Sequence, residues 1–335
     1  MADTTISSLN TATALSANNY IPISDGTDTT KLGTDSLFGF RNRLINGDMR
    51  IWQRGTSFTG VGSGYTADRF GCVVTGITTT VTQSTDVPNL QSLYSLKFVP
   101  ASNATPTEFV VRQNMERQNI TDFAGNTVTA SAWVKCTRTS IKVRCAAYAT
   151  GGTDQIQTKT VAANTWTKIT ATFSAFSAAT SWTDAPNGLG GFLDIGFGED
   201  IAITTADSLF ITEVQLEVGP TATPFERRPI GMELALCQRY YYTGGSFIFA
   251  PLNSDNIAGN IGFPVTMRST PSITVYSTSS IANKVTRIDG VGLTTANVRS
   301  IGVTNTNIMS IQSSPINSFD SAFYQFTLRA EAELN

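Results

Sequence analysis

The residue types that most often carry catalysis are scarce in this chain. It contains no histidine, which excludes Ser-His-Asp and Cys-His catalytic pairs and His-ligated metal sites. Glu199 and Asp200 are neighbouring carboxylates, but glycoside hydrolysis needs two carboxyl groups about 5–10 Å apart across a bond. None of the cysteines has the C-x-x-C spacing of a zinc or redox site; they are Cys72, Cys136, Cys145 and Cys237. We therefore expect no catalytic residue, no metal site and no cofactor.

The four tryptophans offer a different chemistry, because an aromatic ring can stack on the apolar C–H face of a sugar. Trp133 and Trp166 lie in strand-like runs beside alternating apolar residues, and we expect both in the core. Trp52 is expected to serve packing as well. Trp182 lies in a long polar stretch and is the candidate ligand contact, with the anchoring of a loop as the alternative.

Composition and charge limit the partners. Of the 335 residues, 14% are charged, and the net charge is −2, so the chain has no electrostatic footprint for nucleic acid or an anionic membrane. No apolar run reaches the roughly 18 residues of a membrane span, and the first residues lack the basic and apolar regions of a secretory signal. We expect synthesis in a reducing cytoplasm, with the cysteines as free buried thiols; a Cys136–Cys145 bridge is the alternative.

The spacing of turn signals predicts an all-β chain. Between residues 46 and 228, short alternating runs recur between Gly, Asn, Pro and Asp, which is typical of a sandwich. The long connection Ser174–Gly190 favours a jelly roll over a simple meander. The clearest runs are Ser95–Val99, Glu108–Gln113, Thr127–Lys135, Ile141–Tyr148, Trp166–Phe173, Gly191–Phe197 and Leu209–Leu216.

The segments around this domain are shorter. Residues 1–45 are too small to own a core and contain a predicted hairpin, Tyr20–Ser24 with Thr29–Leu32, around the Asp25-Gly26 turn signal. Their apolar residues therefore favour docking on a partner.

Beyond the jelly roll, residues 229–242 predict a linking helix that begins after Pro229. Met232, Leu236 and Tyr240 would share one face of it. Residues 243–335 return to alternating strands and predict a second, smaller β-sandwich.

Motifs at both ends of the jelly roll resemble those of bacteriophage tail-fibre and related virion appendage proteins. Residues 42–55 read Asn-Arg-Leu-Ile-Asn-Gly-Asp-Met-Arg-Ile-Trp-Gln-Arg-Gly, and residues 65–70 read Tyr-Thr-Ala-Asp-Arg-Phe. After the last predicted strand come Thr-Pro-Phe-Glu at 223–226 and Cys-Gln-Arg-Tyr-Tyr at 237–241. The Ala330–Leu334 ending is similar too, so the resemblance covers roughly residues 42–335.

This resemblance implies a homotrimeric, non-enzymatic structural protein of the virion, made in a bacterial cytoplasm. Residues 1–45 would attach to tail adaptor, baseplate or nozzle proteins. The jelly roll also looks like carbohydrate-binding modules, which implies a host-surface glycan as the receptor, with the C-terminal β domain as a candidate for its contact. A capsid decoration or head-fibre protein is the alternative, and a polysaccharide depolymerase is disfavoured because the chain lacks a long parallel-β repeat.

We expect any receptor contact on exposed loops. Trp182 is the first candidate, followed by Gly151–Gln155 and Asn253–Asn256. Such a contact would use aromatic stacking and neutral hydrogen bonds, so binding should depend weakly on salt. A structural calcium near Asp68 and Glu217 remains open.

Overall fold

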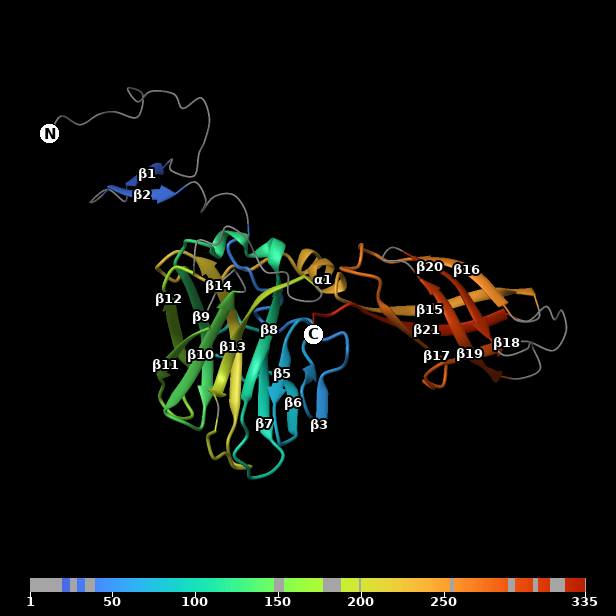
Figure 1. Ribbon diagram of the computed structural model, residues 1–335, viewed down its shortest axis with the longest axis horizontal. Coiled ribbons are helices and arrows are strands. Elements are labelled where there is room, and N and C mark those ends of the chain that lie inside the picture. Colours follow the sequence, from blue (N-terminus) through green and yellow to red (C-terminus); the bar gives the residue numbers. More distant parts are fainter. Residues whose placement is uncertain are drawn as a thin grey trace, which may run out of the picture. The chain divides into compact units, whose positions relative to one another are not determined.

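The computed structural model describes residues 20–24, 29–33, 40–147, 154–176, 188–198, 200–253, 256–288, 293–303, 307–313 and 323–334. The chain divides into two compact units, Met1–Arg41 and Asn42–Asn335 (Figure 1). In the first unit, β1 (Tyr20–Ser24) and β2 (Thr29–Gly33) pair antiparallel, with Tyr20 opposite Gly33. The predicted hairpin is therefore confirmed; the rest of residues 1–39 lies outside the described residues.

Two antiparallel six-stranded sheets form the jelly roll. The front sheet has the order β11-β10-β13-β8-β5-β4, and the back sheet has the order β12-β9-β14-β7-β6-β3. Their strands are β3 (Ser57–Val61), β4 (Gly64–Tyr65), β5 (Gly71–Val74), β6 (Thr79–Ser84), β7 (Ser95–Pro100), β8 (Phe109–Glu116), β9 (Val128–Cys136), β10 (Ser140–Ala147), β11 (Gln155–Thr160), β12 (Thr167–Phe173), β13 (Leu189–Gly198) and β14 (Leu209–Val218). The all-β, jelly-roll prediction is confirmed.

The core lies between these sheets, where alternate side chains of each strand meet. On β9, Ala130, Ala132 and Val134 are buried in it. Phe98 and Phe109 stack across the two sheets, with ring centroids 4.2 Å apart. Because side chains alternate across a strand, the residues between these core positions lie on the outer faces.

The prediction that Trp133 and Trp166 are core residues is wrong. Both are half-buried and belong to none of the core clusters of the described residues. Trp133 lies between the core residues Ala132 and Val134. Because successive side chains of a strand point to opposite faces, Trp133 points outward. Trp52, by contrast, packs against the core, stacks on Phe58 at 6.4 Å and donates from Nε1 to the Met49 carbonyl at 2.7 Å, as predicted.

The short strands β3, β4, β5, β6 and β11 had no clear sequence signal. They have two to six residues each, and β3, β4 and β5 contain glycine, which is depleted in strands. The positions of β5 and β11 come from pairing with longer strands, since β5 lies beside β8 and β11 beside β10.

The predicted helix is α1 (Ile230–Gln238), but its buried face differs from the prediction. Glu233 and Cys237 are the buried helix residues, whereas Met232 is 43% exposed. Glu233 turns inward because Arg228 pairs with it at 3.3 Å and the Asn46 N–H donates to it. A buried ion pair, invisible to an apolar-spacing argument, thus sets the rotation of the helix.

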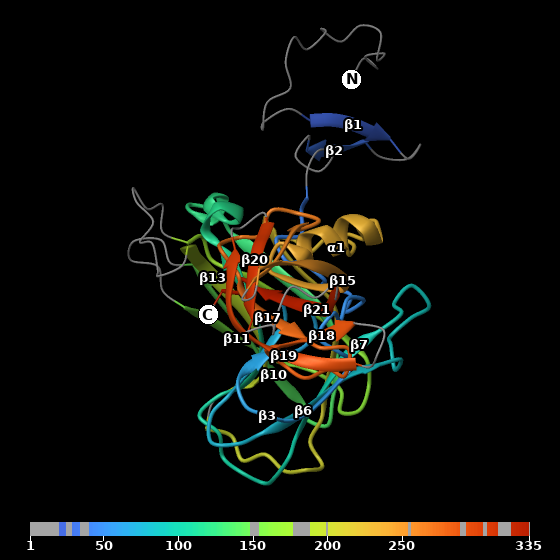
Figure 2. The ribbon, with the colours of Figure 1, turned by 90° about the vertical axis from the view of Figure 1, so that its right-hand side faces the viewer.

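The C-terminal strands form one antiparallel seven-stranded sheet of order β15-β16-β20-β19-β18-β21-β17. An additional pairing of β15 with β21 makes the sheet close on itself, and β17 extends it beyond β21. This sheet faces the viewer in Figure 2. The strands are β15 (Tyr241–Asn253), β16 (Asn256–Gly262), β17 (Ser272–Tyr276), β18 (Lys284–Ile288), β19 (Leu293–Val303), β20 (Asn307–Ser313) and β21 (Phe323–Glu331). Tyr324, Phe326, Leu328 and Ala330 alternate into its core as their spacing predicts.

All four cysteines are free and buried, which confirms the thiol prediction. Burial raises the pKa of each of these thiols, so they are poor nucleophiles. Within the described part of the chain, no helix is long and apolar enough to cross a bilayer.

Candidate functional site

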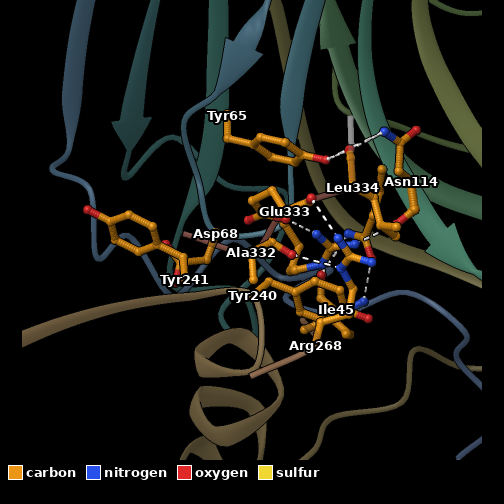
Figure 3. A network of polar contacts seen from close by, with 12 residues as sticks. Ile45, Tyr65, Asp68, Asn114, Tyr240, Tyr241, Arg268, Ala332, Glu333 and Leu334 are labelled. Atoms are coloured by element: carbon orange, nitrogen blue, oxygen red, sulfur yellow. Dashed lines mark hydrogen bonds and ion pairs between the residues drawn. The ribbon is translucent and has the colours of Figure 1, made fainter. Parts of the chain in front are cut away.

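Residues of the motifs at 42–55 and 65–70 meet the Ala330–Leu334 segment in one buried group, which we call the joint (Figure 3). Its charged members are Arg54, Asp68, Arg69 and Glu333. Arg69 donates to Glu333, and both side chains are 1% exposed. Arg54 lies 3.2 Å from Glu333 and 3.9 Å from Asp68. Two cations thus balance two carboxylates away from water.

The end of the chain closes the joint. The Leu334 carbonyl accepts hydrogen bonds from the Tyr65 hydroxyl at 2.5 Å and from Asn114 Nδ2 at 2.8 Å. The Ala332 N–H donates to the Tyr240 carbonyl at 2.8 Å. Residues 332–334 therefore tie the C-terminal sheet to β4 and β8 of the jelly roll, and the quoted motifs hold the fold together.

Aromatic rings and charge stabilise the joint together. The Arg69 guanidinium lies 3.6 Å from the centre of the Tyr240 ring, within cation–π range. Burial alone would lower the pKa of Arg69, but Glu333 raises it above its ordinary value. Burial raises the pKa of Asp68, although hydrogen bonding from Gln53 opposes this. The group is thus an ion-pair network whose members depend on one another.

Glu116, at the end of β8, ties the jelly roll to the end of α1. It accepts from Arg239 Nε at 3.1 Å, from Arg239 Nη2 at 3.0 Å and from the Tyr240 hydroxyl. Burial would raise the pKa of Glu116, but these hydrogen bonds lower it below the ordinary 4.5. Its ionised form is therefore favoured by folding.

Glu116→Gln should lower the free energy of unfolding at pH 7 by about 1.5–3 kcal/mol, the range for hydrogen bonds to charged groups. A depressed folded-state pKa contributes stability that is complete above the unfolded value of about 4.5 and is lost as pH falls through the folded value. The gap between wild type and variant, measured by urea unfolding from pH 3 to 7, should therefore close below about pH 4.5. A gap that is equal at all pH values would contradict this assignment.

The sequence-predicted ligand contacts fall mostly beyond what the structure describes. Trp182 lies outside the described residues, and so do residues 151–153 and 254–255 of the two candidate loops. Asp68 accepts from the Gln53 N–H at 2.9 Å and Glu217 from the Thr223 N–H at 2.9 Å. The described residues contain no group of three or more metal-ligating side chains.

The outer face of the front sheet carries two arginines and two carboxylates that pair with one another. Arg112 donates two hydrogen bonds to the Asp194 carboxylate, from Nε at 2.7 Å and from Nη2 at 2.9 Å. Arg144 bonds Asp194 at 2.8 Å and Glu108 at 2.7 Å. Both guanidinium groups lie over the Phe192 ring, at 4.0 and 5.1 Å. Although burial opposes the positive charge, Asp194 raises the pKa of Arg112, and the rigid pairs hold these side chains in place.

A pocket of about 280 Å³ lies beside this group, which we call the Tyr65 pocket. Gly71, Cys72 and Val73 of β5 provide apolar and backbone surface. Polar atoms come from Arg112 and Asn114 of β8, from Ser63 and from Tyr65 of β4. The complete lining is Ser63, Gly64, Tyr65, Gly71, Cys72, Val73, Arg112, Asn114 and Leu334.

The Tyr65 pocket combines features that small-ligand sites share. Such sites are concave and mostly apolar, with a few polar groups that fix the orientation of the ligand. A sugar ring likewise has an apolar face and a polar edge. Further along the same outer face, a shallow hollow of about 20 Å³ is lined by Glu108, Val110, Lys142, Arg144, Ile156, Asp194 and Gly198. A chain of sugars could extend from the pocket toward this hollow.

A second pocket, of about 220 Å³, opens between the jelly roll and the C-terminal sheet. Tyr241 and Tyr276 are among its aromatic residues, but Arg54 lies 3.6 Å from the first ring centre and Arg329 lies 4.6 Å from the second. Those ring faces are occupied by arginines and are not free to stack on a ligand.

Sequence reasoning missed Val73, Arg112 and Asn114 as site residues. Arg112 and Asn114 alternate with core residues on β8, which indicates an outward direction. Nothing local says that β5 lies beside β8, where Gly71 is opposite Arg112. The pocket is assembled by this long-range pairing.

Comparisons with known proteins give no family assignment. No protein-family model matches the sequence, and no curated protein matches it.

Several solved structures show a partial likeness. One is the enzymatically active domain of tailspike protein 4 of Bacteriophage CBA120, with a TM-score of 0.34, 15% identity and coverage of 53% of this chain but only 22% of that one. Another is the CBM22-1 xylan-binding domain of Paenibacillus barcinonensis Xyn10C, with a TM-score of 0.31, 13% identity and coverage of 54% and 96%. A third is the CBM22-1–GH10 part of Clostridium thermocellum xylanase 10B, with a TM-score of 0.31, 16% identity and coverage of 51% and 30%.

Proposed function

We propose that this chain is a non-enzymatic, homotrimeric tail-fibre protein of a bacteriophage virion, and that it binds a neutral host-surface glycan in the Tyr65 pocket. The observation that carries the binding proposal is the pocket itself. Its apolar wall at Val73 of β5 faces polar side chains of the paired strand β8.

A neutral ligand fits the charge balance of the site. The lining arginine, Arg112, is already paired in two places with Asp194, so no uncompensated charge faces the pocket. Binding would then depend on hydrogen bonds and apolar contact, and single contacts would be weak. Three copies on a trimer could raise the avidity by about 10²–10⁴.

The absence of catalysis is part of the proposal. Asp194 and Glu108 lie in the arginine group on this face, and arginine side chains bind both. A glycosidase needs one carboxylic acid that donates a proton and a second carboxylate across the bond. Carboxylates tied to guanidinium groups suit neither role.

The role in the virion is supported by the motif resemblance and by the first unit. The β1–β2 hairpin is a two-stranded sheet, and such hairpins are marginally stable alone in water. A docking surface on the tail would supply the missing contacts for residues 1–45. The same resemblance implies a homotrimer, so sedimentation equilibrium of the full chain should report three chains per particle.

Val73→Arg tests the glycan site, because Val73 is an outward, half-buried pocket residue and arginine would fill the pocket. On an array of bacterial surface glycans, the wild-type chain should bind at least one neutral glycan, and Val73→Arg should weaken that binding at least tenfold. Leu90→Arg is the matched control, since Leu90 is 99% exposed and receives the same side chain. Equal loss in both variants, or no loss in Val73→Arg, would overturn the proposed site.

A further inference from the structure

The outer face of the back sheet carries a second group of side chains, on the side of the jelly roll opposite the Tyr65 pocket. We call it the lysine–aromatic patch, and it consists of Lys97, Trp133, Lys135, Trp166, Lys168 and Phe210. Lys97, Trp133, Lys135 and Phe210 each lie between two core residues of their strands and so point away from the core. Lys168 of β12 precedes the core residue Ile169, and Trp166, just before β12, contacts the Phe210 ring.

Strand register places lysines and aromatic rings side by side. Trp133 lies opposite Lys168 of β12 and opposite Thr212 of β14. In the neighbouring row, Phe210 lies opposite Lys135 of β9 and opposite Lys97 of β7. Because opposite side chains in a sheet are near neighbours, each ring in these rows has a lysine beside it.

Contacts around Phe210 make the arrangement rigid. The ammonium groups of Lys135 and Lys97 lie 5.0 and 5.4 Å from the Phe210 ring centre. Trp166 meets the same ring edge-on at 6.3 Å. The Trp166 Nε1 donates to Asp86 at 2.9 Å, which fixes the indole. Lys168 and Trp133 stay accessible at the edge of the group, since Lys168 is exposed and Trp133 is half-buried.

The patch has an excess of positive charge in a chain whose net charge is −2. Asp86 is a neighbouring carboxylate, and it pairs with Lys135. Among the described residues, no carboxylate forms an ion pair with Lys97 or Lys168. A ligand here gains by bringing negative charge as well as an apolar ring face.

We infer that the lysine–aromatic patch is a second glycan site, which takes a polysaccharide whose sugars carry carboxylates. A uronate has an apolar C–H face for Trp133 and a carboxylate for Lys168 on the same ring. A chain of such sugars places further carboxylates over Lys97 and Lys135, which lie two strands apart, at about 10 Å. This inference goes beyond the proposed function, because it concerns another face and a charged ligand class.

Single-stranded nucleic acid also binds lysines and aromatic rings, but it uses basic grooves on basic domains. This chain has a net charge of −2, and the patch has three lysines on a sheet face. An acidic sugar therefore fits the patch better than nucleic acid does. A second copy of this chain is the other occupant to exclude.

The test titrates the full chain, in 50 mM salt, with tetramers of galacturonate, mannuronate and guluronate. The methyl esters of the three tetramers and decathymidylate are the comparison ligands. At least one acidic tetramer should bind, its methyl ester should bind about tenfold more weakly, and 500 mM salt should weaken the acidic tetramer because the screening length shortens.

Variants then assign the site. Trp133→Ala should weaken the acidic tetramer about tenfold and Lys168→Gln about fivefold. Lys284→Gln, on β18 of the C-terminal sheet and outside both proposed glycan sites, should leave it unchanged. If Trp133→Ala fails to fold, the exposed Lys168→Gln decides.

Four results would overturn the inference. They are binding of none of the three acidic tetramers at millimolar concentration, equal binding of the methyl ester, tighter binding of decathymidylate than of every tetramer, and an unchanged affinity in Lys168→Gln. A patch variant that changes only the sedimentation of the chain would assign the face to a second copy instead. The glycan proposed for the Tyr65 pocket stands or falls separately, through Val73→Arg.

Discussion

Glu333→Ala should lower the free energy of unfolding by about 3–5 kcal/mol, the cost of removing one partner from a buried ion pair. The substitution leaves the Arg69 guanidinium, 1% exposed, without its carboxylate. It also removes the 3.2 Å contact of Arg54, so the joint keeps two cations for one remaining carboxylate, Asp68. Urea unfolding of the full chain, followed by tryptophan fluorescence, measures the effect.

Glu331→Ala is the matched control, two residues away on the same chain end. Its side chain is 49% exposed, and its contact with Arg54 is 3.5 Å long. Exposed pairs contribute about 0–1 kcal/mol, so this variant should unfold almost with the wild type. Similar losses in the two variants would show that the joint does not carry the stability assigned to it.

Asn46→Ala should destabilise the jelly roll by about 3–8 kcal/mol. The Asn46 side chain is fully buried; it accepts from the Ile51 N–H at 2.9 Å and donates to the Asp68 carbonyl at 3.0 Å. Alanine leaves those two groups unsatisfied, at about 1–3 kcal/mol each. Its φ of +60° adds about 1–2 kcal/mol, because alanine tolerates the left-handed region poorly.

Asn164→Ala separates the two causes. Asn164 also has a positive φ, of +57°, but it is exposed, so its substitution should cost only the backbone part, about 1–2 kcal/mol. Thermal unfolding of both variants measures the difference. If Asn46→Ala costs no more than Asn164→Ala, the buried hydrogen bonds of Asn46 contribute nothing to stability.

Sequence alone predicts most of the regular strands, because their alternation is a local property. The hairpin of β1 and β2 and the core positions of β21 follow from spacing and turn residues. The jelly roll follows from the recurrence of such runs. These signals need no knowledge of what packs on the strand.

Trp133 follows the same alternation, although its size and apolarity favour the core. Its neighbours Ala132 and Val134 are core residues, and the period of two places Trp133 with Lys135 on the outer face. Size and apolarity alone favoured the core. The rule of alternation was the better guide, and it leads to the lysine–aromatic patch.

The joint and the Tyr65 pocket could not be predicted, because they depend on long-range contacts. Arg69 and Glu333 are 264 positions apart in the sequence. Arg112 and Val73 share a pocket only because β5 and β8 pair. Composition pointed to a chain without a charged functional site, since its overall charge is low, whereas the structure gathers charges into balanced buried groups.

The most direct test of the central claim, that the Tyr65 pocket binds the receptor glycan, is a crystal structure of the full chain with the strongest neutral glycan from the array. The claim predicts a sugar ring against Val73, with its hydroxyl groups within hydrogen-bond distance of Arg112 or Asn114. A glycan bound in the pocket between Tyr241 and Tyr276, or only on loops away from the front sheet, would contradict it.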